Sequence, residues 1–330
     1  MKKWAAVLLS ALLLLALGGC GEAKSYTKDL FSMDTVMSLT VYGSDARDAA
    51  EAAATRITAL EAELSVTKED SEIARLNRDG RCALSDDAET LLTRSLALEE
   101  ETGGAFSPAL YSLVSLWGFT TGSYRVPADA EIQTVLAQIR AGSLTVADGT
   151  AIADGVQVDL GAVAKGYAAA EAAAVLKEQG VTSAVLSLGG NVQTVGLKPD
   201  GSLWHIGIRD PQNESENLGV LEVGETAVVT SGGYQRYFEE DGVRYIHIMD
   251  PATGYPADSG LSSVTIVTTD GFLADGLSTA LYVMGLDRAS EFWRGRDDFE
   301  AVLVTDGGEI YVTEGLQGSF SGGEFTVIAR

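Results

Sequence analysis

The chain has 330 residues, of which 46% are hydrophobic and 21% are charged, a composition typical of a globular protein with a substantial core. Its formal net charge of −24 argues against a surface that binds nucleic acid or anionic lipid headgroups by electrostatics, so we expect no nucleic-acid partner. Any phosphate-bearing ligand must therefore be met locally, by backbone N–H groups, a few cations or a metal ion.

The N-terminus has the anatomy of a bacterial lipoprotein signal peptide. Lys2 and Lys3 precede an apolar run over residues 4–17, which is short for a membrane span, and the small residues that follow end at Cys20. We expect cleavage to remove residues 1–19, and a lipid on the new N-terminal cysteine to hold the protein at the extracytoplasmic face of the cell membrane. The alternative is a plain secretory signal in which the cysteine is accidental.

After this cleavage Cys82 has no cysteine with which to pair inside the mature chain. A lone thiol in an exported protein is either buried or reactive, and burial is favoured because free cysteine is among the most buried residue types. Residues 20–28 are polar and predict a short tether. One domain is expected to follow over residues 29–330.

The first part of this domain combines an alternating strand with amphipathic helices. The predicted segments are a strand at 33–42 and helices at 48–64, 86–101 and 127–139. Before the last of these helices lie Phe-Ser-Pro at 106–108 and Trp-Gly-Phe at 117–119, close to glycines. These aromatic residues predict either a surface that stacks an aromatic ligand or, as the commoner meaning, a core cluster.

A glycine-rich turn at 161–166 is the most informative stretch of the chain. A strand expected over 152–160 leads into it, a helix closed by Gly180 follows it, and a further strand is expected at 184–188. Backbone N–H groups at a helix N-terminus favour an anion, and Lys165 would add a full positive charge. The turn fits neither common phosphate-binding glycine motif. The alternative interpretation, a tight strand-helix-strand crossover that needs glycine only for packing, therefore stays open.

The remaining chain is rich in short strands. The predicted segments are strands at 204–208, 219–223, 226–229, 244–249 and 262–267, a helix at 273–284, and a hairpin of strands 301–304 and 309–312 joined by Asp306-Gly307-Gly308. The sequence contains no internal repeat, low-complexity block or long linker. We therefore predict a single α+β domain with mixed β-sheets and flanking helices.

The two histidines of the chain stand in different settings. His205 alternates within a predicted core strand and is interpreted as structural. His247 comes at the end of a predicted strand, just before a proline-rich turn, with Asp250 three residues on. A histidine there can serve as a general base, although a loop histidine with satisfied hydrogen bonds is equally compatible with these residues.

Asp275 and Thr279 are four residues apart on the predicted 273–284 helix and so share one face. A carboxylate and a hydroxyl are oxygen ligands suited to Mg²⁺, which takes few ligands from the protein and the rest from water and phosphate. A polar helix face without a metal is the commoner meaning of such a pair.

A series of motifs along nearly the whole mature chain resembles the ApbE family, the FAD:protein FMN transferases. The motifs are Met33-Asp34-Thr35, Ser71-Glu72-Ile73, Leu76-Asn77, Gly104-Ala105-Phe106, Trp117-Gly118-Phe119, 159–167, Leu188-Gly189-Gly190-Asn191, Thr230-Ser231-Gly232, 247–256 and 274–280. The resemblance implies a T-fold-like lipoprotein domain that uses Mg²⁺ to split the pyrophosphate of FAD. It also implies that FMN passes to a threonine hydroxyl on a flavin-accepting subunit of an extracytoplasmic or membrane redox protein, and that AMP leaves.

The resemblance also assigns roles to individual residues by motif position. The residues implied to contact FAD are Met33, Ala105, Phe106, Ser107, Asp159, Lys165 and Ile248. The ligands implied for the metal are the backbone oxygen of Ala162 and the side chains of Asp275 and Thr279. His247 corresponds to the base that removes the proton of the acceptor threonine.

Two positions depart from the family pattern. Asp34 replaces a frequent glycine and is expected to be harmless on a solvent-facing strand position, whereas Thr67 replaces a frequent aromatic residue and so removes a stacking surface for the flavin. Two alternatives to protein flavinylation stay open: hydrolysis of FAD to FMN and AMP, and a non-catalytic flavin-binding or solute-binding lipoprotein. The presence of Asp275, Thr279 and His247 argues against the second, since a binder needs no base.

Overall fold

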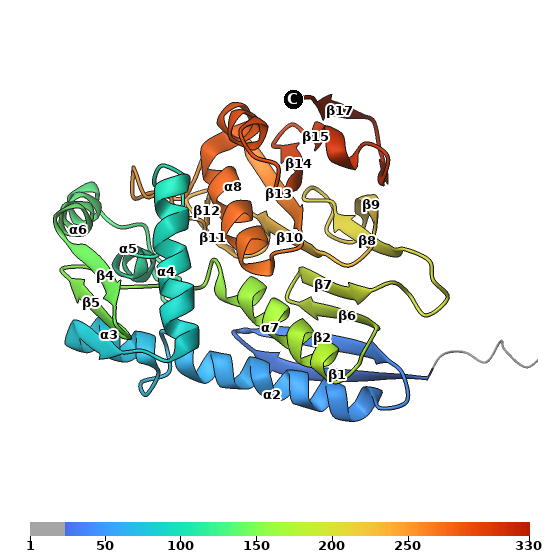
Figure 1. The fold of residues 1–330 in the computed structure, drawn as a ribbon. Helices are drawn as coiled ribbons and strands as arrows, with labels where there is room; N and C mark the ends of the chain where they lie inside the picture. The colour runs from blue at the N-terminus through green and yellow to red at the C-terminus, as the bar shows by residue number, and fades with distance from the viewer. Residues whose placement is uncertain (1–23) are drawn as a thin grey trace, which may run out of the picture.

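The computed structural model describes residues 24–330, so the predicted signal peptide and the lipidated Cys20 lie outside the described residues. The described chain is an α+β domain of mixed sheets and flanking helices, as predicted (Figure 1). Within residues 24–330 the largest sheet has nine strands, in the spatial order β1 (Ser25–Ser32), β2 (Thr35–Tyr42), β6 (Ser183–Leu188), β7 (Asn191–Gly196), β10 (Ala227–Gly232), β13 (Leu261–Thr268), β14 (Glu300–Thr305), β15 (Ile310–Thr313) and β17 (Phe325–Ile328). Neighbouring strands are antiparallel except for the parallel pair β15 and β17.

Three helices, α2 (Ala46–Leu64), α7 (Ala164–Glu178) and α8 (Gly271–Arg294), cover one face of this sheet (Figure 1). Their buried side chains join strand residues such as Leu39 and Leu186 in the main core. α2 packs directly against α7, and the buried residues of both helices are largely alanine. Small side chains at this contact allow the two helices to lie close together.

The opposite face of the main sheet is covered by a smaller sheet of β8 (Trp204–Arg209), β9 (Asn217–Val223) and β16 (Phe320–Gly322). A second apolar cluster fills the space between the two sheets, with Leu221 from the small sheet and Val228 from the main sheet among its members. The central strands of the main sheet are therefore buried on both sides, which explains their apolar runs, whereas β1 and the start of β2 at its edge are exposed on one side.

The remaining elements lie beside this layered core. They are the helices α3 (Glu72–Asp79), α4 (Asp86–Glu101), α5 (Tyr111–Leu116) and α6 (Asp129–Ala141), the strands β3 (Arg81–Ala83), β4 (Ser143–Ala147), β5 (Thr150–Asp154), β11 (Tyr237–Glu240) and β12 (Val243–Ile246), and a 3₁₀ turn at Glu314–Leu316. Trp117 and Phe119 are buried in a third apolar cluster that includes Leu113 and Ile132. This confirms the core interpretation for Trp117, whereas Phe119 packs in the cluster and also lines the cavity described below.

Several predicted boundaries need correction near the N-terminus and the central glycine-rich turn. Met33 and Asp34 form the turn between β1 and β2, so the second strand starts at Thr35. Residues 25–28, assigned to a tether, belong to β1. β5 ends earlier than expected, at Asp154, and lies in a different sheet from β6. The central stretch is therefore not a crossover between strands of one sheet.

Other predictions can also be compared with the structure. The bounds of α4, the burial of Cys82 and the hairpin of β14 and β15 are confirmed. The expected core position of His205 is wrong: its side chain is on the solvent side of β8, with Nε2 3.3 Å from Glu222. Among the residues that the structure describes, no helix is long and apolar enough to cross a membrane.

Candidate active site

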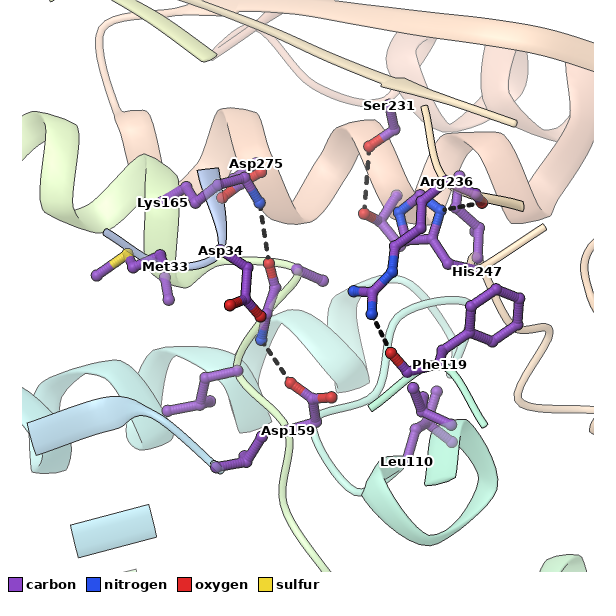
Figure 2. A pocket seen from close by; sticks show the side chains of 18 of the residues that line it. Met33, Asp34, Leu110, Phe119, Asp159, Lys165, Ser231, Arg236, His247 and Asp275 are labelled. Atoms are coloured by element: carbon purple, nitrogen blue, oxygen red, sulfur yellow. Dashed lines mark hydrogen bonds between the residues drawn. The ribbon is translucent and has the colours of Figure 1, made fainter. Parts of the chain in front are cut away.

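A cavity of about 410 Å³ lies where several elements end (Figure 2). Its wall comes from the β1–β2 and β6–β7 turns, the loop after α4, the N-terminus of α7, one face of α8 and the segments that follow β10 and β12. Every site residue that the sequence predicted inside the domain lines this cavity: Met33, Ala105, Phe106, Ser107, Asp159, Ala162, Lys165, His247, Ile248, Asp275 and Thr279. The fold thus brings together residues from widely separated parts of the chain.

Two glycines bring α7 and α8 into close contact beside the cavity. A Cβ atom at Gly166 would lie 2.0 Å from the carbonyl oxygen of Gly271, and a Cβ atom at Gly271 would lie 2.4 Å from the carbonyl oxygen of Gly166. Because neither residue has a side chain, the first turn of α7 reaches Asp275, and the Gly166 N–H donates to its Oδ2 at 2.8 Å. The carboxylate is thus held at the N-terminal end of α7, where the helix dipole favours negative charge.

The oxygen atoms around Asp275 have the chemistry of a hard-cation site. Asp275 is 4% exposed and forms no ion pair with another described residue, and a buried carboxylate without a counter-charge is unfavourable. One turn further along α8, the Thr279 hydroxyl lies 3.4 Å from that of Ser231 on the same wall. Residues 24–330 hold no group of three or more His, Cys, Asp or Glu that could bind a metal. A cation here would therefore need hydroxyl, main-chain and substrate oxygens as well.

Two cationic side chains line the cavity of this strongly acidic protein. Lys165 Nζ donates to the carbonyl of Gly161 at 3.2 Å, and the Gly161 N–H donates to Asp159 at 2.8 Å. The Arg236 guanidinium donates to the carbonyl of Phe119 (Figure 2). Burial raises the pKa of Asp159, against the opposing effects of the Gly161 N–H and the two cations. The predicted anion-binding turn thus has local positive charge beside it.

His247 directly follows β12, and its Nδ1 lies 3.1 Å from the carbonyl oxygen of Arg236 (Figure 2). A carbonyl only accepts hydrogen bonds, so Nδ1 carries the proton and Nε2 keeps its lone pair. Burial is the main cause that lowers the pKa of His247 to about 4, and Lys165 and Arg236 act in the same direction. The ring is therefore neutral at pH 7. Asp250, the carboxylate expected beside it, accepts hydrogen bonds within its own turn instead.

The β1–β2 turn contributes another part of the cavity wall. Met33 and Asp34 have φ values of 49° and 59°, the left-handed geometry of a type I′ hairpin turn, and the Met33 N–H donates to Glu61 at 2.9 Å. Asp34 was expected on a harmless strand position, but it occupies this turn and lines the cavity. Aspartate is tolerated there because its short polar side chain adopts the left-handed region more readily than most. Thr67 is exposed and lines the cavity as well.

Comparison with known proteins shows to which family this chain belongs. The model of the ApbE family matches residues 33–303. The chain belongs to the ApbE family. The family predicted from the sequence motifs is thereby confirmed.

Relatives in the ApbE family are similar over most of their length. The chain is 32% identical to the FAD:protein FMN transferase of Treponema pallidum (strain Nichols), with 92% of each protein covered. It is 33% identical to the FAD:protein FMN transferase of Klebsiella pneumoniae (strain 342), with 91% of this chain and 95% of the relative covered. The crystal structure of the ApbE protein from Thermotoga maritima has a TM-score of 0.82 at 32% identity, over 88% of this chain and 98% of that one. For the flavin transferase ApbE from Vibrio cholerae the TM-score is 0.80 at 28% identity, over 90% and 99%.

The residues that line the cavity of this ApbE-family protein but were not predicted as site residues include Asn191, Ser231 and Arg236. Asn191 and Ser231 belong to two of the recognised motifs, so the sequence held a signal for their importance but none for their role. Arg236 belongs to no motif. Only the fold places its carbonyl oxygen against His247 and its guanidinium in the cavity.

Proposed function

We propose that this protein is an FAD:protein FMN transferase, which moves FMN from FAD to a threonine hydroxyl of an acceptor flavoprotein and releases AMP. Relatives similar over nine-tenths of the chain carry this enzyme name. The observation that carries the proposal is the neutral imidazole of His247 in one cavity with Lys165 and the Asp275–Thr279 pair. A base, a cation and an oxygen cluster are what attack by a hydroxyl on a pyrophosphate requires.

The oxygen cluster fits Mg²⁺. Its ligands would be the side chains of Asp275 and Thr279 and the main-chain oxygen of Ala162, and the buried, unpaired carboxylate supports this fit. When bound, the ion would supply charge stabilisation to the phosphate oxygens.

His247 would take the proton of the acceptor hydroxyl on Nε2. The hydroxyl oxygen attacks the FMN phosphorus, the new P–O bond forms, and the bridging P–O bond breaks so that AMP leaves with the electron pair. Lys165 and Arg236 would offset the negative charge of the pyrophosphate and of the leaving group. All of these groups line the one cavity, so no large movement is needed to assemble them.

We also propose that the protein works at the extracytoplasmic face of the cell membrane, held by a lipid on Cys20. The charged start, the apolar run and the small residues before this cysteine support the proposal. The acceptor would be a flavin-accepting subunit of an extracytoplasmic or membrane redox protein.

A second candidate is hydrolysis of FAD to FMN and AMP, in which water takes the place of the threonine hydroxyl. Thr67 is the observation that supports hydrolysis, because this exposed position in the cavity wall offers no aromatic surface to the flavin. A weaker hold on the flavin would let water compete with the acceptor.

The deciding experiment combines the full chain in detergent with FAD, Mg²⁺ and a flavin-free acceptor domain that carries the target threonine. We expect the acceptor to gain the mass of one FMN less one water, as a phosphoester with the threonine requires. We expect AMP to appear in equal amount. An acceptor whose threonine is replaced by valine is the control and should gain nothing. AMP and free FMN without modified acceptor would establish hydrolysis, and no turnover of FAD at all would exclude both enzymes.

A further inference from the structure

Asn191 carries a buried hydrogen-bond donor for which the protein supplies no partner. It is the first residue of β7, directly after the Gly189–Gly190 turn, and it is 3% exposed. Its side-chain nitrogen has no acceptor among the described residues, yet the residue lines the cavity. A buried polar group without a partner is unfavourable, so it indicates that a ligand supplies the missing acceptor.

The register of the main sheet decides which way this side chain faces. Asn191 lies directly opposite Leu188 on β6, and directly opposed residues point to the same face of a sheet. Leu188 belongs to the core beneath α2, α7 and α8, so the Asn191 amide faces these helices. On neighbouring β10, Ser231 lies opposite Val264 of the same core and faces the same way.

The turn that precedes this residue is held firmly in place. Gly189 has a φ of 62°, and a Cβ atom there would lie 2.5 Å from the side-chain oxygen of Thr35. Such close packing leaves the start of β7 little freedom to move. The backbone that leads to Asn191 is therefore packed closely at the edge of the cavity.

The groups around Asn191 in the cavity indicate which part of a ligand its amide would bind. Asn191 lines the same cavity as Asp275 and Thr279, and its amide faces the helix that carries them, so it shares the cavity with the oxygen cluster proposed for a cation. We propose that the Asn191 side-chain NH₂ donates a hydrogen bond to a pyrophosphate oxygen of FAD. A neutral amide suits this place, because a lysine or arginine would pair with the Asp275 carboxylate and compete with the metal. The inference rests on the proposed function and adds a residue that binds the pyrophosphate of the substrate.

The test measures equilibrium binding of FAD and of ADP, which shares the pyrophosphate but lacks the flavin, to the full chain with Mg²⁺ present. We expect Asn191→Ala to weaken both by about 10-fold, and Asn191→Asp, which puts a negative charge in place of the donor, to weaken both by more than about 10-fold. Thermal unfolding of each variant reports whether it folds, and Asn191→Asp nearly preserves the shape of the side chain.

Gln193 supplies the matched control. It lies two residues along β7 on the same face, is equally buried and has an unpartnered side-chain oxygen, but it does not line the cavity. We expect Gln193→Ala to leave both affinities unchanged. Unchanged ADP binding by folded Asn191 variants would overturn the inference. This holds even if FAD binding is lost, because a loss confined to FAD would mean that Asn191 contacts the flavin and not the pyrophosphate. Failure of the unmodified chain to bind FAD would overturn the proposed function and the inference with it.

Discussion

At the scale of single residues, the surroundings of His247 decide what it can do. A main-chain carbonyl selects its tautomer and burial keeps the ring neutral. A general base typically contributes about 10²–10⁴-fold to a rate, so we expect His247→Asn to slow FMN transfer by about that factor while FAD affinity stays close to that of the unmodified enzyme. Time courses of acceptor mass measure the transfer rate. Retention of most of the activity would mean that His247 only braces the turn that follows it.

The lowered pKa of His247 predicts the direction of the pH dependence. Above about pH 4 the ring is neutral and able to accept a proton, so kcat/KM for transfer should change little down to about pH 5 and fall below that. The free energy of unfolding should change with pH in the same direction. A histidine whose pKa is 6.5 in the unfolded chain and about 4 in the folded protein contributes stability above pH 6.5, and this contribution is lost as the pH falls through 4. A rate profile centred near 6.5 would contradict the lowered pKa of this half-buried ring.

Asp275 combines a charge with a structural hydrogen bond, so asparagine is the informative replacement. Asp275→Asn keeps an acceptor for the Gly166 N–H, and we expect it to lose Mg²⁺-dependent FAD turnover by more than about 100-fold with little change in the free energy of unfolding. Asp275→Ala should lose the same turnover and in addition about 1–3 kcal/mol of stability, because the Gly166 N–H is left without an acceptor. Turnover across a Mg²⁺ titration and urea unfolding separate the two effects. Normal turnover in either variant would remove the metal role.

At the scale of elements, the crossing of α7 and α8 positions Lys165, Asp275 and Thr279 in the wall of the cavity. Gly271→Ala should lower the free energy of unfolding by about 1–3 kcal/mol, because its Cβ atom would lie 2.4 Å from the Gly166 carbonyl oxygen and would force the helices apart. FAD turnover should fall with it, since Asp275 moves with α8. Urea unfolding measures the stability change.

The same helix offers a control for this substitution. Gly295 caps α8 with a φ of −83°, and the nearest atom to a Cβ there would be 3.5 Å away. Gly295→Ala should therefore change the free energy of unfolding by less than about 0.5 kcal/mol. Equal losses in the two variants would show that the crossing is not specially tight.

At the scale of the whole molecule, the net charge bears on the two proposals that this protein binds an anionic substrate and is held at a membrane. The net charge of −24 repels FAD at long range, so we expect binding to depend on the local cations Lys165 and Arg236 and on the N-terminus of α7. The same charge weakens adsorption to anionic lipid. Membrane attachment is therefore expected to depend on a covalent anchor rather than on the protein surface.

Replacement of Cys20 tests this expectation. In cells that express Cys20→Ala, we expect the protein to leave the membrane fraction, because lipidation of this residue is the anchor that the sequence predicts. Fractionation followed by immunoblotting of the membrane and soluble pools measures it. A variant that stays firmly in the membrane would mean that the apolar N-terminal segment is retained as a helix.

Local sequence was sufficient for the features that depend on local periodicity and residue chemistry. Helix α4 has the bounds expected from its spacing of leucines, and the hairpin of β14 and β15 follows from Asp306-Gly307-Gly308. The sequence motifs also selected residues that the fold gathers in one cavity. Periodicity and turn chemistry act over a few residues, so they can be read without knowing what packs against them.

The features that sequence reasoning missed depend on contacts between distant segments. Nothing near Gly166 indicates that Gly271 will lie against it, and nothing near His205 shows that its face of β8 meets solvent. Nothing near Arg236 places its carbonyl against His247. Alternation shows that two faces of a strand differ, but the layers around the strand decide which face is buried. Sequence by itself thus determined the family, the main elements and the residue types of the site. Only the tertiary structure decided their mutual geometry and the lowered pKa of His247, because burial and long-range contacts set both.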